Sequence, residues 1–310
     1  EQAYDAECLD SLFAQNAPHR AGIVLCVNNT TDDTAAIALH RARAARWPLL
    51  VLEAELAEGG VGEARRLGHR VALRAAPRAS AVLSTDADCV PAPRWQAEME
   101  QALCHAPTVL GRIEVAEHEL AGFPGPFLQR QYIENDFVQL SMEFERLMDP
   151  AGPDGIGLNT AGGANLGFRR DTYRRVGGYR PLPRGEDRDI VARIRLAGLR
   201  PIRADRAVVV ASMRQIGRAP GGMANHILAR SGNEDCSVDS ALIPFEAMVA
   251  RHLGRAPASL PMTLSRVTQD LPLLRDCVDG LRELSCIHSR RRHLAALLCP
   301  PREMENPLGN

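Results

Sequence analysis

The sequence predicts an α/β fold: a doubly wound, mainly parallel sheet with helices on both faces, followed by a helical C-terminal extension. Short apolar runs of strand length alternate with helical stretches through the first two thirds of the 310 residues. The runs are apolar almost throughout instead of alternating with polar residues, which is typical of strands covered on both faces. Alternation of strands and helices favours right-handed crossovers and therefore a parallel sheet.

Five runs rich in Val, Leu and Ile are the predicted strands. They are residues 22–27, 49–53, 81–85, 108–115 and 207–212. The helices expected around them are residues 4–15, 33–46, 61–76 and 92–105. Pro93 lies near the start of the last of these helices, where the missing N–H is tolerated.

The middle of the chain departs from this alternation. A Gly/Pro-rich turn leads into a long predicted helix over residues 127–148, and a second glycine-rich loop follows up to residue 165. Long glycine-rich loops inside an α/β pattern often serve as functional lids. From residue 236 onward only helical patterns occur, so we expect an α/β domain over residues 1–235 and a helical extension over 236–310.

Composition narrows the function further. A net charge of −1 does not suggest general nucleic-acid binding. The chain contains no lysine, which excludes a Schiff-base lysine and a Walker A lysine. Its eight cysteines include no C-x-x-C pair, as expected of buried thiols in a reducing compartment. No apolar run reaches the roughly 20 residues of a membrane span, and no signal-peptide pattern opens the sequence, so we expect a soluble, cytoplasmic protein.

Polar clusters follow three of the predicted strands, where ligands bind in open α/β sheets. The clusters are "VNNTTDDT" (27–34), "EGGVGEARRLG" (58–68) and the pair Asp86 and Asp88. A D-x-D tripeptide alone is better explained by capping and solvation of the following turn, and only the ordered series of signals favours a metal site. A fourth feature is the acidic pair Glu186 and Asp187 at the start of a predicted helix, where the helix dipole favours ionised carboxylates or a simple capping role.

Taken in order, these segments resemble the family 2 glycosyltransferases, which have the Rossmann-like GT-A fold. "IVLCVNNTTDDT" resembles the family's second strand and following turn, and "GGVGEARRLG" its G-x-G-x-A-R segment. "VLSTDADCVPAPRW" resembles its D-x-D strand end. "GGANLGFRRDTYRRVGGY" and the following "GEDRD" resemble its acceptor-side loop and E-D motif. The resemblance covers about residues 1–215, roughly two thirds of the chain.

The resemblance implies a donor site and a base. Asp88, supported by Asp86, would hold Mg²⁺ or Mn²⁺ against the diphosphate of a UDP- or GDP-sugar, because such hard cations take oxygen ligands. Asp187 would be the general base that deprotonates an acceptor hydroxyl, with inversion at the anomeric carbon. Glu186 would position that acceptor. The nucleotide would bind at Asn28, Asn29, Asp32, Gly62, Arg65 and Asp86, and the sugar or acceptor pocket would include Gly162, Gly163 and Asn165.

Three basic side chains after the last predicted strand are further candidates. Arg214 and Arg218 are placed to bind phosphate oxygens through their guanidinium groups, or to lie solvated on the surface. His226 is either a third metal ligand or, more commonly for a lone histidine, a structural residue.

The sequence also departs from the family pattern. The family's first strand would precede residue 1, so we expect the native chain to begin earlier. Val27 stands where the family usually has an aspartate that reads the base, which leaves the donor nucleotide open. The alternatives are a retaining GT-A enzyme of the glycosyl-phosphoglycerate synthase type, a nucleotidyltransferase, and a non-catalytic nucleotide-sugar-binding module. The absence of lysine argues against the nucleotidyltransferase, and the intact acidic pairs argue against the last.

Overall fold

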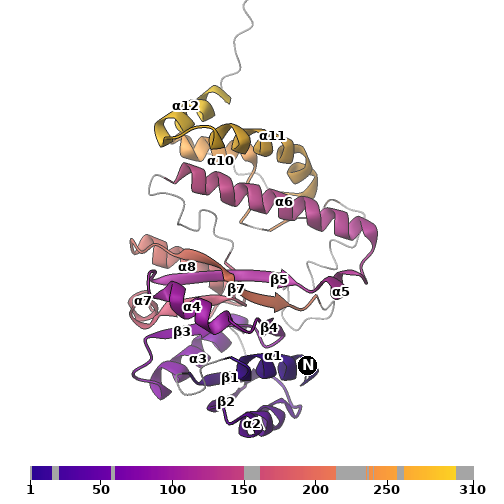
Figure 1. Ribbon diagram of the computed structural model, residues 1–310, viewed down its shortest axis with the longest axis vertical. Coiled ribbons are helices and arrows are strands. Elements are labelled where there is room, and N and C mark those ends of the chain that lie inside the picture. Colours follow the sequence, from indigo (N-terminus) through magenta and orange to yellow (C-terminus); the bar gives the residue numbers. More distant parts are fainter. Residues whose placement is uncertain are drawn as a thin grey trace, which may run out of the picture. The chain divides into compact units, whose positions relative to one another are not determined.

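The contacts of the chain divide it into two compact units. The first is Glu1–Pro124 with Asp154–Gly232, and the second is Gly125–Pro153 with Asn233–Asn310. The computed structural model describes residues 2–15, 21–56, 60–149, 161–213, 235, 237–239, 241–256 and 262–297. The first unit holds all the strands, and Figure 1 shows the two units in sequence colours.

The second unit consists mainly of helices. They are α6 (Gly125–Met148), α10 (Phe245–His252), α11 (Leu264–Arg282) and α12 (Ile287–Leu297). The long predicted helix is therefore found as α6. It packs against α11 and α12, so it groups with the C-terminal helices instead of the α/β unit, which differs from the expected boundary at residue 235. No helix in the described part of the chain is both long and apolar enough to cross a membrane.

The first unit follows the predicted alternation. Its elements are α1 (Gln2–Phe13), β1 (Ile23–Asn28), α2 (Thr34–Ala45), β2 (Leu49–Ala54), α3 (Gly60–Ala75), β3 (Ala81–Ser84), β4 (Cys89–Pro91), α4 (Trp95–Leu103), β5 (Thr108–Val115), α5 (Glu117–Leu120), β6 (Leu166–Arg169), α7 (Arg170–Arg175), α8 (Glu186–Leu196) and β7 (Ile202–Ala211). β4 and the first half of β7 were not predicted. β4 has three residues, and β7 opens with a charged stretch that hides the strand pattern.

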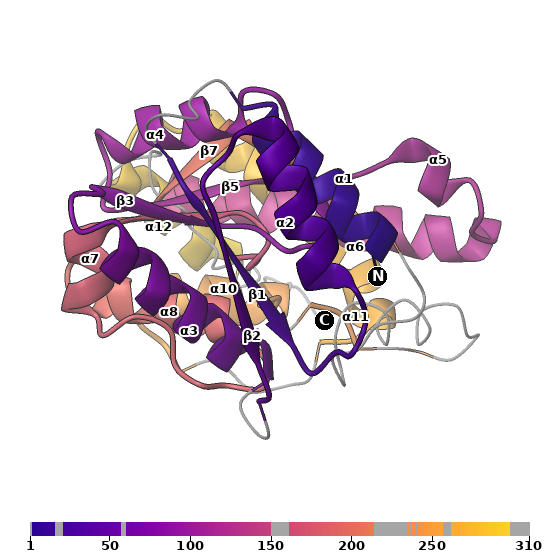
Figure 2. The same cartoon turned by 90° about the horizontal axis from the view of Figure 1, so that it is seen from below.

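The seven strands of the described residues form two hydrogen-bonded groups. β1 and β2 pair in parallel, with Ile23 opposite Leu49, and Figure 2 shows α2 and α3 on opposite sides of this pair. The other five strands have the order β3-β6-β5-β7-β4. β3 and β5 both run antiparallel to β6, and β5 runs parallel to β7, so β3, β5 and β7 point the same way.

The five-stranded sheet separates two apolar cores. Neighbouring residues of a strand point to opposite faces. Accordingly, Val109 of β5 packs in a cluster with Trp95 and Met99 of α4, whereas Leu110 packs in a cluster with Phe168 and Ile190. Helices therefore cover both faces, as the unbroken apolar runs predict.

One large cavity of the first unit lies between the two strand groups. It measures about 2440 Å³ and is lined by residues 23–26 of β1, 81–84 of β3 and side chains of α1 and α3. This exceeds the roughly 300–1,000 Å³ of an ordinary ligand pocket. Within the described residues, no strand pairs with β1 or β3 on this side.

Candidate functional site

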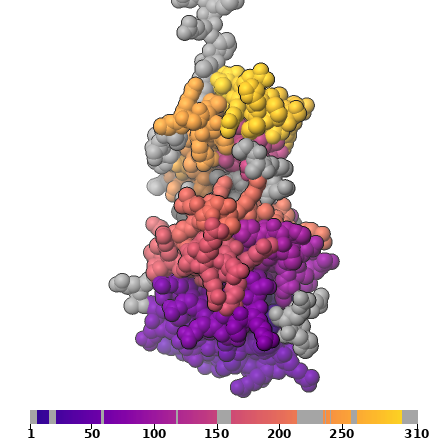
Figure 3. All heavy atoms as spheres, turned by 90° about the vertical axis from the view of Figure 1, so that its left-hand side faces the viewer, coloured from indigo at the N-terminus to yellow at the C-terminus, as the bar shows by residue number. Residues whose placement is uncertain are grey.

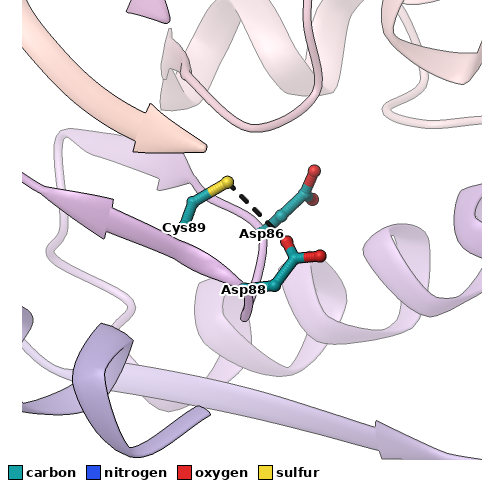
Figure 4. A group of neighbouring side chains, drawn as sticks. All are labelled: Asp86, Asp88 and Cys89. Carbon is teal, nitrogen blue, oxygen red and sulfur yellow. Dashed lines mark hydrogen bonds between the residues drawn. The ribbon is translucent and has the colours of Figure 1, made fainter. Parts of the chain in front are cut away.

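Asp86 and Asp88 lie in the tight turn that follows β3. The N–H of Cys89 donates to the carbonyl oxygen of Asp86 at 3.1 Å, which closes the turn and starts β4. Figure 4 shows the side chains of Asp86, Asp88 and Cys89 grouped at this turn, and their ligand atoms all lie within 4.8 Å of one another. The D-x-D segment is thus a structural turn that also presents two carboxylates side by side.

Cys89 supports this turn as a protonated thiol. The side chain is 2% exposed, and its Sγ lies 3.7 Å from Oδ1 of Asp88, to which it donates. Burial, together with the charges of Asp86 and Asp88, raises the pKa of the Cys89 thiol far above its usual value. The carboxylates of Asp86 and Asp88 offer oxygen ligands, which hard cations such as Mg²⁺ or Mn²⁺ prefer.

Arg65 of α3 connects the separate predicted motifs. Its guanidinium forms an ion pair with Asp86 and a second one, at 2.9 Å, with Oε1 of Glu186. It also donates to Oγ of Ser84 at 2.7 Å and to the carbonyl oxygen of Gly163 at 2.8 Å. Burial alone would lower the pKa of Arg65, but the surrounding carboxylates raise it above its ordinary value. Burial raises the pKa of Glu186, and Arg65 offsets part of that rise.

Asp187 is the second residue of α8 and lies beside this cluster. Its Oδ2 accepts from the N–H of Gly163 at 2.8 Å, and its Oδ1 accepts from the N–H of Arg188 at 2.7 Å. α8 contacts α3, and the colours of these segments meet on the face of the first unit drawn in Figure 3. Asp86, Asp88 and Asp187 line the same cavity. Two carboxylates suited to a cation and a third, separately held carboxylate therefore share one opening.

The family model confirms the resemblance that these motifs indicate. The profile described as glycosyl transferase family 2 matches residues 1–172, which is more than half of the chain. The chain belongs to glycosyltransferase family 2. It is therefore a glycosyltransferase.

Solved structures confirm the GT-A fold of this family 2 chain. The mannosyltransferase PcManGT from Pyrobaculum calidifontis, in complex with GDP-Man and Mn²⁺, is 18% identical over 96% of this chain and 82% of its own, with a TM-score of 0.53. TarS 1-349 of S. aureus, in complex with UDP-GlcNAc, is 18% identical over 88% of this chain and 68% of its own, with a TM-score of 0.52. Among curated protein sequences, none matches this chain.

Several residues of this glycosyltransferase that were predicted to bind nucleotide have local structural partners. Asn29, at a positive φ of 52°, exchanges two hydrogen bonds with the backbone of Leu56 and so ties the end of β1 to the end of β2. Oδ1 of Asp32 accepts from the N–H of Thr34 at the start of α2. Asn28 lines the cavity. The nucleotide-binding roles of these residues stay predictions.

Two of the predicted glycines permit close backbone approach. The N–H of Gly62 donates to the carbonyl oxygen of Leu182 at 3.1 Å, and a Cβ there would lie 2.5–2.7 Å from the backbone of Arg180 and Leu182. A Cβ on Gly163 would strike the guanidinium of Arg65. Larger residues at these positions would therefore push α3 or the Gly163 loop out of place.

Asn165 and Gly162 lie beside the site but serve the sheet. The amide of Asn165 is 1% exposed; it donates to the carbonyl oxygens of Arg112 and Ala207 at 2.8 Å and accepts from Nε1 of Trp95 at 2.8 Å. The N–H of Asn165 donates to the carbonyl oxygen of Gly162. Contact of either residue with a sugar stays a prediction. Arg214, Arg218 and His226 lie outside the described residues, as does most of the loop before Gly162.

His69 was not among the predicted site residues, although it follows Arg65 by one helical turn. Its Nδ1 lies 2.8 Å from the carbonyl oxygen of Arg65, and its ring stacks on Tyr173 with centroids 5.0 Å apart. Tyr179 and Phe168 meet the same ring edge-on. Burial lowers the pKa of His69 to about 4, so the ring is neutral and supports the helix turn that carries Arg65.

This neutral histidine predicts a pH-dependent stability. The unfolded chain protonates His69 near its ordinary pKa of 6.5, whereas the folded chain does so only near pH 4, so the unfolded state binds more protons in between. Stability is therefore retained above pH 6.5 and falls by up to about 3 kcal/mol as the pH drops toward 4. Urea unfolding at pH 7 and pH 5 should show a smaller difference for His69→Phe than for wild type. The exposed His40→Gln should keep the wild-type difference, and an equal pH dependence in His69→Phe would contradict the assignment.

Proposed function

We propose that this family 2 protein is an inverting, metal-dependent glycosyltransferase that moves a sugar from a nucleotide-diphosphate donor to an acceptor hydroxyl. The observation that carries the proposal is the placement of Asp86, Asp88 and Asp187 around one cavity. The two relatives named above support a nucleotide-sugar donor, because their structures contain GDP-Man and UDP-GlcNAc.

Asp88 and Asp86 are the residues that would hold Mg²⁺ or Mn²⁺. Their oxygens are close enough to reach one ion, and neither carboxylate is buried. The ion would supply Lewis-acid stabilisation of the charge that develops on the departing diphosphate. Mn²⁺ in the PcManGT complex supports a divalent cation here.

Asp187 is the proposed base. Two backbone N–H groups hold its carboxylate, and the N-terminus of α8 favours its ionised form. Its partners are neutral amides instead of a cationic side chain, so the carboxylate keeps lone pairs with which to accept the proton of an acceptor hydroxyl. Asp187 would take the proton of the acceptor hydroxyl, whose oxygen would attack the anomeric carbon on the face opposite the departing diphosphate, and this in-line displacement would invert the configuration.

A nucleotide panel tests the donor assignment. With Mn²⁺ present, UDP or GDP should raise the melting temperature, because a ligand at 100 times its Kd contributes about 2.7 kcal/mol of stability. Thermal shifts are measured with UDP, GDP, dTDP and CDP, with and without Mn²⁺. Asp88→Asn should lose the metal-dependent part, whereas the distant, exposed Asp205→Asn should keep it. No metal-dependent shift with any nucleotide would overturn the proposal.

A further inference from the structure

We propose that Glu186 and Arg65 form a positioning pair for the metal carboxylate: Glu186 holds Arg65, and Arg65 holds Asp86 and the Gly163 carbonyl. Glu186 then serves the donor side of the site through Arg65, instead of positioning the acceptor. The proposal rests on the function proposed above and adds positioning residues to it.

Most of the hydrogen-bond donors of the Arg65 guanidinium are used within the protein. A guanidinium has five N–H donors. Four hydrogen bonds use them: Nε donates to Glu186, Nη1 to Ser84 and Gly163, and Nη2 to Asp86. Arg65 is thus a cross-brace within the protein, with at most one donor left for a nucleotide.

Burial separates the brace from the groups that meet ligand. The side chain of Arg65 is 9% exposed and that of Glu186 is 4% exposed, whereas that of Asp86 is 40% exposed. A sugar hydroxyl therefore has little access to Glu186. All three residues line the cavity, but the side chain of Asp86 is far more exposed than those of Arg65 and Glu186.

Charge balance gives Glu186 a specific task. Arg65 stands against Asp86, so by itself it would cancel the charge that a divalent cation needs. The carboxylate of Glu186 compensates Arg65, and together with Asp86 and Asp88 it leaves a net charge of −2 beside the proposed ion. Removing the Glu186 charge leaves −1, and Arg65 then relies on Asp86 for charge compensation.

The same brace reaches the base through one glycine. The carbonyl oxygen of Gly163 accepts from Arg65, and its N–H donates to Asp187. A Cβ at this position would collide with the guanidinium, so only glycine lets Arg65 approach this closely. Loosening Arg65 should therefore loosen the N–H that orients Asp187.

Binding measurements without an acceptor test the pair. The Kd of Mn²⁺ with UDP or GDP is measured by calorimetry for wild type, Glu186→Gln, Arg65→Met and the double variant. Glu186→Gln should weaken binding by about tenfold, the size expected when one charge is removed near a divalent cation. The double variant should bind Mn²⁺ and nucleotide no more weakly than whichever single variant binds them less well, because both changes break the same contact. The double variant also removes both charges of the pair, so it remains a usable test if Arg65→Met alone folds poorly. Arg66→Met, which removes the exposed neighbour paired with Glu63, is the matched control and should bind as wild type does.

Amide hydrogen exchange provides a second readout in ligand-free protein. The Gly163 N–H should exchange several-fold faster in Glu186→Gln and in Arg65→Met than in wild type or Arg66→Met. Two results would overturn the proposed pair. One is that the effects of the two single variants on Kd multiply in the double variant. The other is that Glu186→Gln has both the Kd and the Gly163 exchange rate of wild type. If wild type binds no Mn²⁺–nucleotide, the proposed function fails, and the exchange rates still decide whether Glu186 holds the brace.

Discussion

Asp187→Asn is expected to reduce sugar transfer by about 10²–10⁴-fold, the contribution typical of a general base, while nucleotide binding persists. An asparagine Oδ1 still accepts one of the two N–H bonds from Gly163 and Arg188, so the loop should keep its shape. The amide cannot take the hydroxyl proton. Release of UDP or GDP from the matching sugar nucleotide, with acceptor present, measures transfer, and calorimetry measures binding.

The control for this variant lies on the same helix. Asp189 pairs with Arg180 at 3.1 Å and with Arg193 at 2.7 Å, away from Gly163. Asp189→Asn should therefore transfer sugar at close to the wild-type rate if the protein folds. Loss of nucleotide binding together with transfer in Asp187→Asn would mean that Asp187 is structural, and retained transfer would assign the base elsewhere.

Asp88→Asn is expected to weaken Mn²⁺ binding by at least about tenfold, more than Asp86→Asn does, because a full ligand charge is lost at the ion. Asp86 already shares its charge with Arg65, whereas Asp88 accepts a hydrogen bond from the thiol of Cys89. The measurement is Mn²⁺ titration followed by electron paramagnetic resonance, with and without nucleotide.

The relative effects of Asp88→Asn and Asp86→Asn on Mn²⁺ affinity test the assignment of Asp88 as the principal metal ligand. Asp86→Asn also leaves the buried Arg65 with Glu186 as its one carboxylate ion-pair partner, so its melting temperature is recorded alongside. Stronger weakening by Asp86→Asn in a protein of wild-type stability would make Asp86 the principal metal ligand. Equal, unchanged affinity in both variants would remove the metal site from this turn.

Local patterns predicted most of the secondary structure. β5 occupies residues 108–115, as its apolar run indicates, and α6 extends the expected helix by two residues at its start. The start of β7 was not predicted because Arg203, Asp205 and Arg206 interrupt the apolar pattern. Its pairing partner, β5, lies about 90 residues earlier in the chain. The length of β7 is therefore set by pairing with a distant strand, and a short window of sequence carries no information about that pairing.

The candidate site divides in the same way. The positions of Asp86, Asp88 and Asp187 at strand and helix ends follow from local sequence, and the structure places them around one cavity. The ligand-binding roles that the resemblance implies for Glu186 and Asn165 stay predictions. The structure adds that these residues are only 3% and 1% exposed and are hydrogen-bonded within the protein. Burial and partner choice depend on contacts between distant segments, so residue type alone did not reveal them.

By itself, the sequence determined the α/β class, the order of the motifs and the family, because apolar periodicity and short motifs are local. Only the tertiary structure showed that Arg65 links Glu186, 121 positions away, to Asp86 and to Gly163. A buried guanidinium must satisfy its donors within reach, and folding alone brings those acceptors together.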